Sequence, residues 1–392
     1  MGFKGRFGLV VTGGAGVVLV LTAGCAGGGD GGEQGTLAAG ESAAVTITPA
    51  NGAGSVKPDG PIEVRVAEGT LQGVTVQGQG VTVTGKMAGD KKSWKSDRTL
   101  SPGASYTVTA QARNDGKTST ATSTFKTLKA DKPLSVLDVT PNVEGEKVGV
   151  GMPIIVRFNR AVTDKAAVER ALRVTPEKPV EGAWRWIGSD QVIYRTKTYW
   201  QPHQKVAFNA QLAGINAGAG VYGTKDVNET ITIGAAQITT GNIGKHHMTV
   251  TRDGKKLRKV PFSAGNGTTR EYTTTSGVHL TMGKENPVTM VSPGRKPGEP
   301  GYYKTVVNYG VRFSASGQYT HAMASTVGVQ GSANVSHGCL NLSPANAKWY
   351  YDIMQRGDVI KLTGSDRDME WNNGWGFWQL SFQKWKSGSA LG

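Results

Sequence analysis

The chain has 392 residues, a formal net charge of +15 and two cysteines. This length predicts two or three domains. Glycine, at 56 residues, is about twice as frequent as usual while core-forming residues are not depleted. This composition excludes collagen, disordered chains, disulfide-rich scaffolds and four-cysteine zinc sites, and it favours β-rich domains with many turns.

The N-terminus has the features of an export signal. A basic start precedes an apolar run over 7–21, which is shorter than the ~20 residues that span a bilayer. Small residues directly before Cys25 resemble the lipobox of bacterial lipoproteins, in which such a cysteine is acylated. We expect a lipoprotein signal peptide at 1–24, lipidation of Cys25, and a flexible glycine-rich tether over 25–43. Thr22 stands where a lipobox usually has leucine, so an ordinary signal peptide with an incidental cysteine is the alternative.

The charge of the mature chain bears on its surroundings. Cleavage before Cys25 removes Lys4 and Arg6, which lowers the net charge from +15 to +13. A basic exported protein suits acidic neighbours such as headgroups, wall polymers or carboxylate-bearing stem peptides. Export argues against nucleic acid as a partner. We expect a membrane-attached protein, lipid-anchored at the outer face of the cytoplasmic membrane and reaching into the cell wall.

An internal repeat follows the tether. One motif begins at Thr48 and again at Thr140, an offset of 92. It consists of Thr-Pro, eleven further residues, and then Pro-Ile-x-Val-Arg followed by an apolar residue. A second echo, Leu100-Ser-Pro102 against Trp200-Gln-Pro202, has an offset of 100. The difference predicts a loop insertion in the second copy.

Repeats of this size with short alternating runs and turn signals are typical of immunoglobulin-like β-sandwiches. We expect one immunoglobulin-like domain over 44–127 and a second over 134–234, with a linker at 129–133. Neither contains cysteine, and the two together contain one histidine. We interpret both as spacers.

The third unit, 235–363, contains five of the six histidines, the second cysteine and a net charge of +9. Its patterns predict a mostly β domain, with an Asp253-Gly254 turn and strands at 248–252, 259–262, 278–281, 303–307 and 359–362. One helix is expected at 345–356, with Ser343 as N-cap and Gly357 at its end.

The candidate site is His321, fourteen residues, and then Ser336-His337-Gly338-Cys339-Leu340-Asn341. A thiol ionises poorly at neutral pH, so a nucleophilic cysteine needs a basic neighbour, and a histidine supplies one. Gly338 frees the backbone beside Cys339 for an oxyanion. Gly328 and Gly331 are expected to mark turns that return the chain to Cys339. The alternative is a small core cysteine with incidental histidines.

This motif resembles the signature of the L,D-transpeptidases, which have a YkuD-type catalytic domain. The resemblance continues through Ser325 to Gly331 and through Asn341 to Trp349, and it includes the whole plan of actinobacterial members. It implies a mainly β protein: two immunoglobulin-like domains, a catalytic domain with one or two short helices, and a tryptophan-rich subdomain at 364–392. That tail either contacts wall or membrane or, as we favour, packs back on the protein.

The resemblance also implies the roles of the site residues. Cys339 would be the acylated nucleophile, His321 its base, and the backbone carbonyl of Ala322 would orient the histidine. The N–H groups of His337, Gly338 and Cys339 would form the oxyanion hole. Pocket shape and loop support would come from Ser336, His337 and Asn341. A substrate lid over about 284–303 would carry a tyrosine, either Tyr302 or Tyr303.

The implied reaction is peptidoglycan cross-linking without metal or other cofactor. Cys339 would attack the third residue of a donor tetrapeptide stem, release D-alanine and form a thioester. The side-chain amine of a diamino acid in an acceptor stem would resolve it to a 3→3 cross-link. Carbapenem-type β-lactams would acylate the same cysteine.

Other assignments stay open at this level. A wall-tethered cysteine peptidase or carboxypeptidase on stem peptides is the nearest enzyme alternative, although papain-like wall hydrolases place their cysteine before their histidine. A sortase needs an arginine shortly after its cysteine, whereas the next arginine here is Arg356. A non-catalytic wall-binding lipoprotein is the alternative from another class. A metal site is disfavoured because the adjacent His246 and His247 would face opposite ways on a strand.

Overall fold

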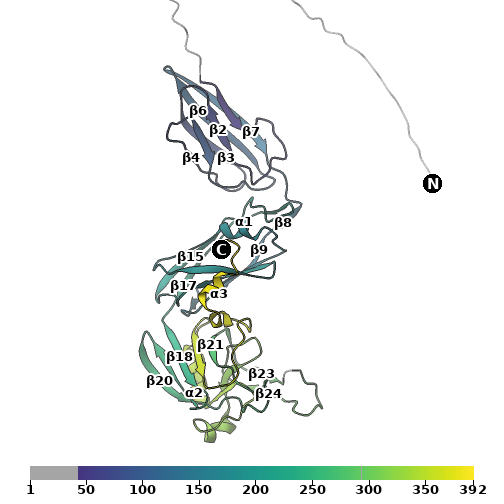
Figure 1. Cartoon of the computed structure of the whole chain (residues 1–392), viewed down its shortest axis with the longest axis vertical. Coiled ribbons are helices and arrows are strands. Elements are labelled where there is room, and N and C mark those ends of the chain that lie inside the picture. The colour runs from purple at the N-terminus through teal and green to yellow at the C-terminus, as the bar shows by residue number, and fades with distance from the viewer. Residues whose placement is uncertain (1–42, 293) are drawn as a thin grey trace, which may run out of the picture. The chain divides into compact units, whose positions relative to one another are not determined.

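The computed structural model describes residues 43–292 and 294–392. The expected signal peptide, Cys25 and nearly all of the tether lie outside the described residues, so those expectations stay predictions. Strands dominate the described chain (Figure 1), which confirms the mainly β class. No helix within these two stretches is long and apolar enough to cross a membrane.

The first sandwich consists of a four-stranded sheet, in the order β1-β2-β5-β4, and a three-stranded sheet, β3-β6-β7. Side chains alternate between the core and solvent along β6, as a two-residue period requires. The core includes the fully buried Ile62, Val64 and Tyr106. The strands are β1 (Val45–Thr48), β2 (Glu63–Val66), β3 (Thr70–Gly78), β4 (Gly85–Met87), β5 (Ser93–Ser96), β6 (Ser105–Asn114) and β7 (Lys117–Lys126).

The second sandwich pairs the sheets β9-β11-β14-β13 and β10-β17-β15-β12 around a core that includes Phe158 and Phe208. Strand β8 begins at Lys132, inside the expected linker, and pairs with β16. The elements are β8 (Lys132–Leu134), β9 (Val136–Thr140), β10 (Lys147–Val148), β11 (Ile154–Phe158), α1 (Lys165–Arg170), β12 (Leu172–Pro176), β13 (Gly182–Ile187), β14 (Gln191–Thr196), β15 (Gln204–Ala210), β16 (Val221–Gly223) and β17 (Val227–Ile233).

The repeat in the sequence is a repeat of strand pairing. Thr48 pairs with Glu63 in the first sandwich, and Thr140 pairs with Ile155 in the second, so both partners are shifted by the same 92 residues. The Thr–Pro peptide bond that follows is cis in both copies. The repeated motif therefore specifies the same strand–turn–strand unit twice.

The expected insertion in the second copy is also present. Three residues separate β2 from β3, whereas thirteen separate the corresponding β11 and β12. Helix α1 lies in this longer segment, and Asp164 caps it by accepting a hydrogen bond from the Ala167 N–H at 2.9 Å. The insertion is thus a short capped helix.

The third unit contains a five-stranded sheet, β20-β19-β18-β28-β21, and a four-stranded sheet, β22-β25-β26-β27. Phe262, Phe313 and Tyr350 are fully buried in its core. The elements are β18 (Gln237–Asn242), β19 (His247–Arg252), β20 (Lys255–Pro261), β21 (Gly277–Leu280), β22 (Gly283–Glu285), β23 (Val288–Val291), β24 (Lys304–Val307), β25 (Gly310–Arg312), β26 (Tyr319–Ala322), η1 (Ala324–Val329), β27 (Leu340–Leu342), α2 (Pro344–Ile353) and β28 (Val359–Thr363). Every expected strand is present with shifted ends, and Asp253 and Gly254 form the expected turn with positive φ.

Helix α2 begins as expected but ends early. The Ser343 hydroxyl accepts a hydrogen bond from the Asn346 N–H, and Pro344 is the first helical residue. The helix ends at Ile353, so the expected extension to residue 356 is wrong. Met354 is extended and fully buried, and the Gln355 N–H donates to the Asp358 carboxylate at 2.8 Å. The helix ends here because Met354 is buried in an extended conformation and the Gln355 N–H bonds to a side chain instead of continuing the helix.

The aromatic tail packs against the second sandwich. It contains η2 (Gly376–Gln379) and α3 (Phe382–Lys386). Trp385 is fully buried, and its indole N–H donates to the Ala183 carbonyl at 2.9 Å. Arg195 of β14 donates to the carbonyls of Phe377 and Leu380 at 3.0 and 3.1 Å. These contacts agree with the packing interpretation of the tail.

Candidate active site

Two parallel strands bring the motif histidine and cysteine together. Strands β26 and β27 pair Thr320 with Leu340 and His321 with Asn341. Paired residues share a face of the sheet, and so do residues two apart along a strand. Cys339 directly precedes β27, so it lies at the end of the strand that pairs with the His321 strand. The fourteen intervening residues fold away as η1 and a loop.

His321 has a defined tautomer. Its Nδ1 lies 3.1 Å from the backbone carbonyl of Ala322, and a ring nitrogen that faces a carbonyl carries the proton. The other nitrogen, Nε2, is then free to accept a proton. Burial lowers the pKa of His321, which is 4% exposed. The structure thus contains a neutral, oriented base, with Ala322 placed as the resemblance implied.

Cys339 is a neutral thiol in this arrangement. Burial raises its pKa to about 11, and a hydrogen bond from the Tyr319 backbone offsets only part of that rise. Its Sγ lies 3.8 Å from the Gly317 carbonyl. A protonated thiol becomes a nucleophile only if a base removes its proton during attack. The pair is suited to a proton transfer coupled to bond formation.

Hydrogen bonds hold the turn that carries Cys339. Gly338 has a φ of 115°, which favours glycine. The Gly338 N–H donates to the Ser336 hydroxyl at 3.1 Å, and that hydroxyl donates to the Cys339 carbonyl at 2.6 Å. The Gly338 N–H is therefore committed, and the expectation that it joins the oxyanion hole is wrong. Of the three expected donors, the N–H groups of His337 and Cys339 remain.

A threonine supports this turn from behind. Thr274 is 1% exposed; its hydroxyl donates to the Gly338 carbonyl and accepts from the Gly265 N–H, both at 2.8 Å. The Gly338 carbonyl and the Cys339 N–H belong to one planar peptide and point in opposite directions. Thr274 therefore fixes the direction of the Cys339 N–H.

Two tyrosines contact the exposed side chain of His337. Tyr303 stacks on the imidazole with ring centroids 4.6 Å apart, and Tyr272 contacts it edge-on at 4.4 Å. Tyr302 instead donates its backbone N–H to Glu299 within the same loop. Of the two candidate tyrosines, Tyr303 is therefore the one at the site.

The expected lid is a β-hairpin. Strands β23 and β24 pair from Val288↔Val307 to Val291↔Lys304, so the element continues past the expected end at 303. Val288, Met290 and Val307 form a cluster with Tyr319, and Cys339 packs against it. The hairpin thus covers the thiol with apolar side chains.

The remaining motif residues are structural neighbours of the thiol. Asn341 is 4% exposed, and its backbone exchanges hydrogen bonds with Ser263. Gly328 lies within η1, so the expectation of a turn there is wrong, whereas Gly331 has a φ of 93°. The sequence analysis missed Thr274 and Tyr272, because no motif distinguishes a buried threonine or tyrosine before its contacts are known.

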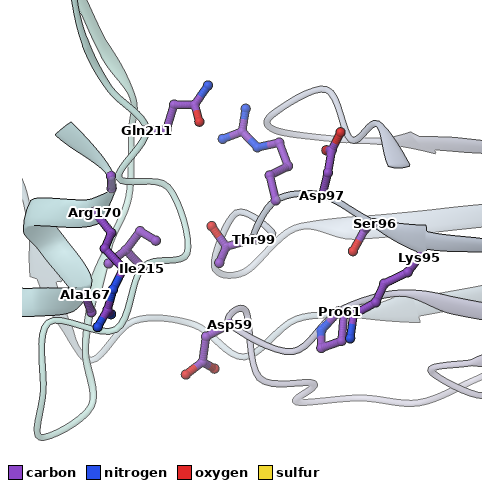
Figure 2. A pocket seen from close by; sticks show the side chains of 12 residues that line it. Asp59, Pro61, Lys95, Ser96, Asp97, Thr99, Ala167, Arg170, Gln211 and Ile215 are labelled. Atoms are coloured by element: carbon purple, nitrogen blue, oxygen red, sulfur yellow. The ribbon is translucent and has the colours of Figure 1, made fainter. Parts of the chain in front are cut away.

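Two other features of the described chain bear on where a ligand or metal could bind. A pocket away from this site is lined by residues of both sandwiches, and Figure 2 shows Asp59, Thr99 and Arg170 among them. It includes none of the expected site residues. Over residues 43–292 and 294–392, no group of three or more His, Cys, Asp or Glu side chains is placed to hold a metal ion.

Known proteins resemble the chain along most of its length. The family profile "L,D-transpeptidase catalytic domain" matches residues 237–362, and "Bacterial Ig domain" matches 53–216. L,D-transpeptidase 2 of Mycobacterium tuberculosis is 32% identical over 350 residues, which cover 88% of this chain and 85% of that protein. L,D-transpeptidase 5 of the same species is 32% identical over 355 residues, covering 88% and 77%. A solved structure of the LD transpeptidase LdtMt1 in complex with imipenem aligns with a TM-score of 0.51 and 35% identity, covering 58% of this chain and 99% of that one.

Proposed function

This chain belongs to the L,D-transpeptidase family of acyltransferases, and we propose that it forms 3→3 cross-links between peptidoglycan stem peptides through a thioester on Cys339. One observation carries the proposal. A half-buried neutral thiol directly precedes the strand that pairs with the strand of a neutral histidine, whose ring is oriented by the Ala322 carbonyl at 3.1 Å. This arrangement suits acyl transfer through general-base activation of a nucleophile.

The first step acylates the enzyme. The Cys339 sulfur bonds to the carbonyl carbon of the third residue of a donor tetrapeptide, and the thiol proton passes to His321 Nε2. The amide C–N bond then breaks, and the same proton goes to the departing nitrogen of D-alanine. The Cys339 N–H, which points away from Thr274, is the donor best placed for the developing oxyanion.

The second step is the same exchange in the opposite direction. A neutral side-chain amine of a diamino acid in an acceptor stem attacks the thioester carbon and gives one proton to His321. The C–S bond breaks, and the Cys339 sulfur takes that proton back. The apolar underside of the hairpin β23–β24 excludes water while the thioester waits for the amine.

Two further parts of the proposal concern inhibitors and location. A relative has been solved in complex with imipenem, and we expect carbapenems to acylate Cys339 here. Lipidation of Cys25 would hold the protein at the outer face of the membrane, with the sandwiches as spacers toward the wall. Globomycin-sensitive processing, read as a mass shift lost in Cys25→Ser, tests the anchor separately.

A disaccharide-tetrapeptide tests the chemistry. Incubated with the protein and followed by mass, it should lose D-alanine, give an acyl adduct on Cys339 and yield a cross-linked dimer. Cys339→Ala, which removes only the sulfur, should abolish all three. Shortened peptides without dimer would indicate a carboxypeptidase instead, and no reaction would indicate a binding protein.

A further inference from the structure

The sulfur of Cys339 meets backbone groups from both neighbours of one residue, Gln318. The Gly317 carbonyl lies 3.8 Å from Cys339 Sγ and accepts from the thiol, and the Tyr319 backbone donates a hydrogen bond to the same sulfur. The carbonyl suits the neutral thiol, and the donor suits the negative charge that develops when His321 removes the proton. The position of Gln318 therefore sets where both of these groups meet the sulfur.

Hydrogen bonds immobilise Gln318 at every polar group. Its backbone N–H donates to the Ser314 hydroxyl at 2.9 Å, and its carbonyl accepts from the Phe313 N–H at 3.0 Å. Its side-chain oxygen accepts from the Thr275 hydroxyl at 2.9 Å, and its side-chain nitrogen donates to the Thr273 carbonyl at 3.2 Å. The residue is 5% exposed, so water has little access to these bonds.

A buried histidine supports the threonine. Thr275 and His279 are both fully buried, and His279 Nε2 lies 2.7 Å from Thr275 Oγ1. The Gln318 oxygen only accepts, so the single hydroxyl hydrogen of Thr275 goes to it, and the hydroxyl oxygen accepts from His279 Nε2. The Nδ1 contact with the Ile360 carbonyl is longer, at 3.3 Å. Burial lowers the pKa of His279 to about 4, so the ring is neutral and carries its one proton on Nε2.

The same short segment holds the turn that carries Cys339. Thr274 donates to the Gly338 carbonyl at 2.8 Å, while its two neighbours, Thr273 and Thr275, bind the Gln318 side chain. A Cβ on Gly338 would stand 3.7 Å from the Gln318 side-chain nitrogen. Three consecutive threonines thus connect the backbone that carries the thiol to the backbone that contacts its sulfur.

We propose that Gln318 is a positioning residue for the nucleophile, and that Thr275 and His279 act through it. The chain of side chains keeps the two flanking backbone groups against the sulfur, so that the thiol stays where its base can take the proton. The inference rests on the proposed function, which makes Cys339 the nucleophile, and adds the residues that set where its sulfur lies. A displacement of about 1 Å can cost on the order of 10²-fold in rate.

Two substitutions at opposite ends of one hydrogen bond test this. Gln318→Met keeps the length of the side chain and removes its polar groups, and Thr275→Val keeps the shape and removes the hydroxyl. Each should lower kcat for D-alanine release from tetrapeptide about tenfold, with KM changed less than twofold. The rate constant for acylation of Cys339 by excess imipenem should fall equally. Thr275→Ser, which keeps the hydroxyl, should restore most of both rates.

Further variants connect the loss to the chain of hydrogen bonds. The double variant Thr275→Val/Gln318→Met should be about as slow as either single variant, because both break one connection, whereas independent losses would multiply to about a hundredfold. His279→Phe removes only the donor to Thr275 and should cost about threefold. Thr281→Val is the matched control, because it removes an equally buried hydroxyl that has no partner among the described residues; it should keep the parent rates.

The outcomes separate the two claims. If tetrapeptide forms no acyl adduct on Cys339 of the parent protein, the proposed function fails, and the imipenem rate constants alone decide the positioning role. If the adduct forms but Gln318→Met and Thr275→Val keep the parent kcat, or change only KM, the positioning role is overturned and the transferase activity stands. Losses that multiply in the double variant overturn it as well. So does failure of both single variants to unfold cooperatively in urea, which would make these side chains a requirement of folding alone.

Discussion

At the scale of single residues, the site works with neutral partners. Burial raises the pKa of Cys339 to about 11 and lowers that of His321, so an ion pair is not the resting state. Sequence reasoning expected a cationic or basic neighbour for the thiol, and the structure specifies the basic one. We expect the half-buried thiol and the buried histidine to react only when a carbonyl carbon approaches.

The first prediction concerns pH. Because the pKa of His321 is lowered from its ordinary value of 6.5, the histidine is a free base throughout the neutral range. Acylation of Cys339 by imipenem should be flat from pH 7 to 9 and should decline only in acid below pH 6.5, as His321 is protonated. The rate at each pH is measured by quenching the reaction at several times and determining the acylated fraction of the protein by mass spectrometry. A rate that increases steadily toward pH 9 would instead indicate that the thiolate form limits the reaction.

A second prediction concerns Thr274. Thr274→Val keeps the shape but removes the hydroxyl that fixes the Gly338 carbonyl at 2.8 Å. Loss of a whole oxyanion donor costs about 10²–10³ in kcat, so loosening one should lower kcat by about tenfold with little change in KM. Thr274→Ser should restore most of the rate. Equal kcat values for Thr274→Val and the parent protein would remove Thr274 from this role.

At the scale of elements, the sequence predicted what local chemistry decides and missed what packing decides. Ser343 and Pro344 specify the start of α2, and the Asp253-Gly254 turn and the strand pattern are correct. The end of α2 depends on burial of Met354 and on the Asp358 side chain, which no local signal shows. Likewise, His321 and Cys339 could be predicted as a pair because their motif is specific. The hydrogen bond from the Gly338 N–H to the Ser336 hydroxyl could not be predicted, because it depends on where that side chain lies.

The lid hairpin carries the third prediction. Tyr303 stacks on His337 with ring centroids 4.6 Å apart, and both Tyr303 and Cys339 pack against the apolar cluster of the hairpin. Tyr303→Ala should open this side to water, so the ratio of hydrolysis to transfer should increase several-fold. Tyr303→Phe keeps the stacked ring and should behave like the parent protein. Both products are counted by mass in one reaction; an unchanged ratio in Tyr303→Ala would show that the stack does not exclude water.

At the scale of the whole molecule, the second sandwich is bonded to the catalytic domain around Asp358. The Gly149 N–H donates to the Arg356 carbonyl at 2.8 Å, and Arg356 pairs with Glu146 at 2.6 Å. A Cβ on Gly149 would collide with Asp358, so the close approach requires glycine there. The sandwich is therefore more than a spacer, because its strand ends cover a buried carboxyl group of the catalytic domain.

That carboxyl group makes stability depend on pH. Burial raises the pKa of Asp358 from 3.8 to about 7, against hydrogen bonds from Gln355 and Gln237 that lower it. Between these values the folded protein holds a proton that the unfolded chain has released, so stability decreases as pH rises from about 4 to 7 and levels off above the folded pKa. The slope from this one group is at most about 1.4 kcal/mol per pH unit.

Asp358→Asn removes the titration and keeps an oxygen acceptor for Gln355 and Gln237. Relative to the parent protein, this variant should gain stability as pH increases from 4.5 to 7.5, as measured by urea unfolding at several pH values. Asp352→Asn, at an exposed carboxylate paired with Lys348 at 2.7 Å, is the matched control and should follow the parent curve. Parallel curves for Asp358→Asn and the parent protein would mean that Asp358 is ionised in the folded state, and that the junction with the second sandwich tolerates a buried charge.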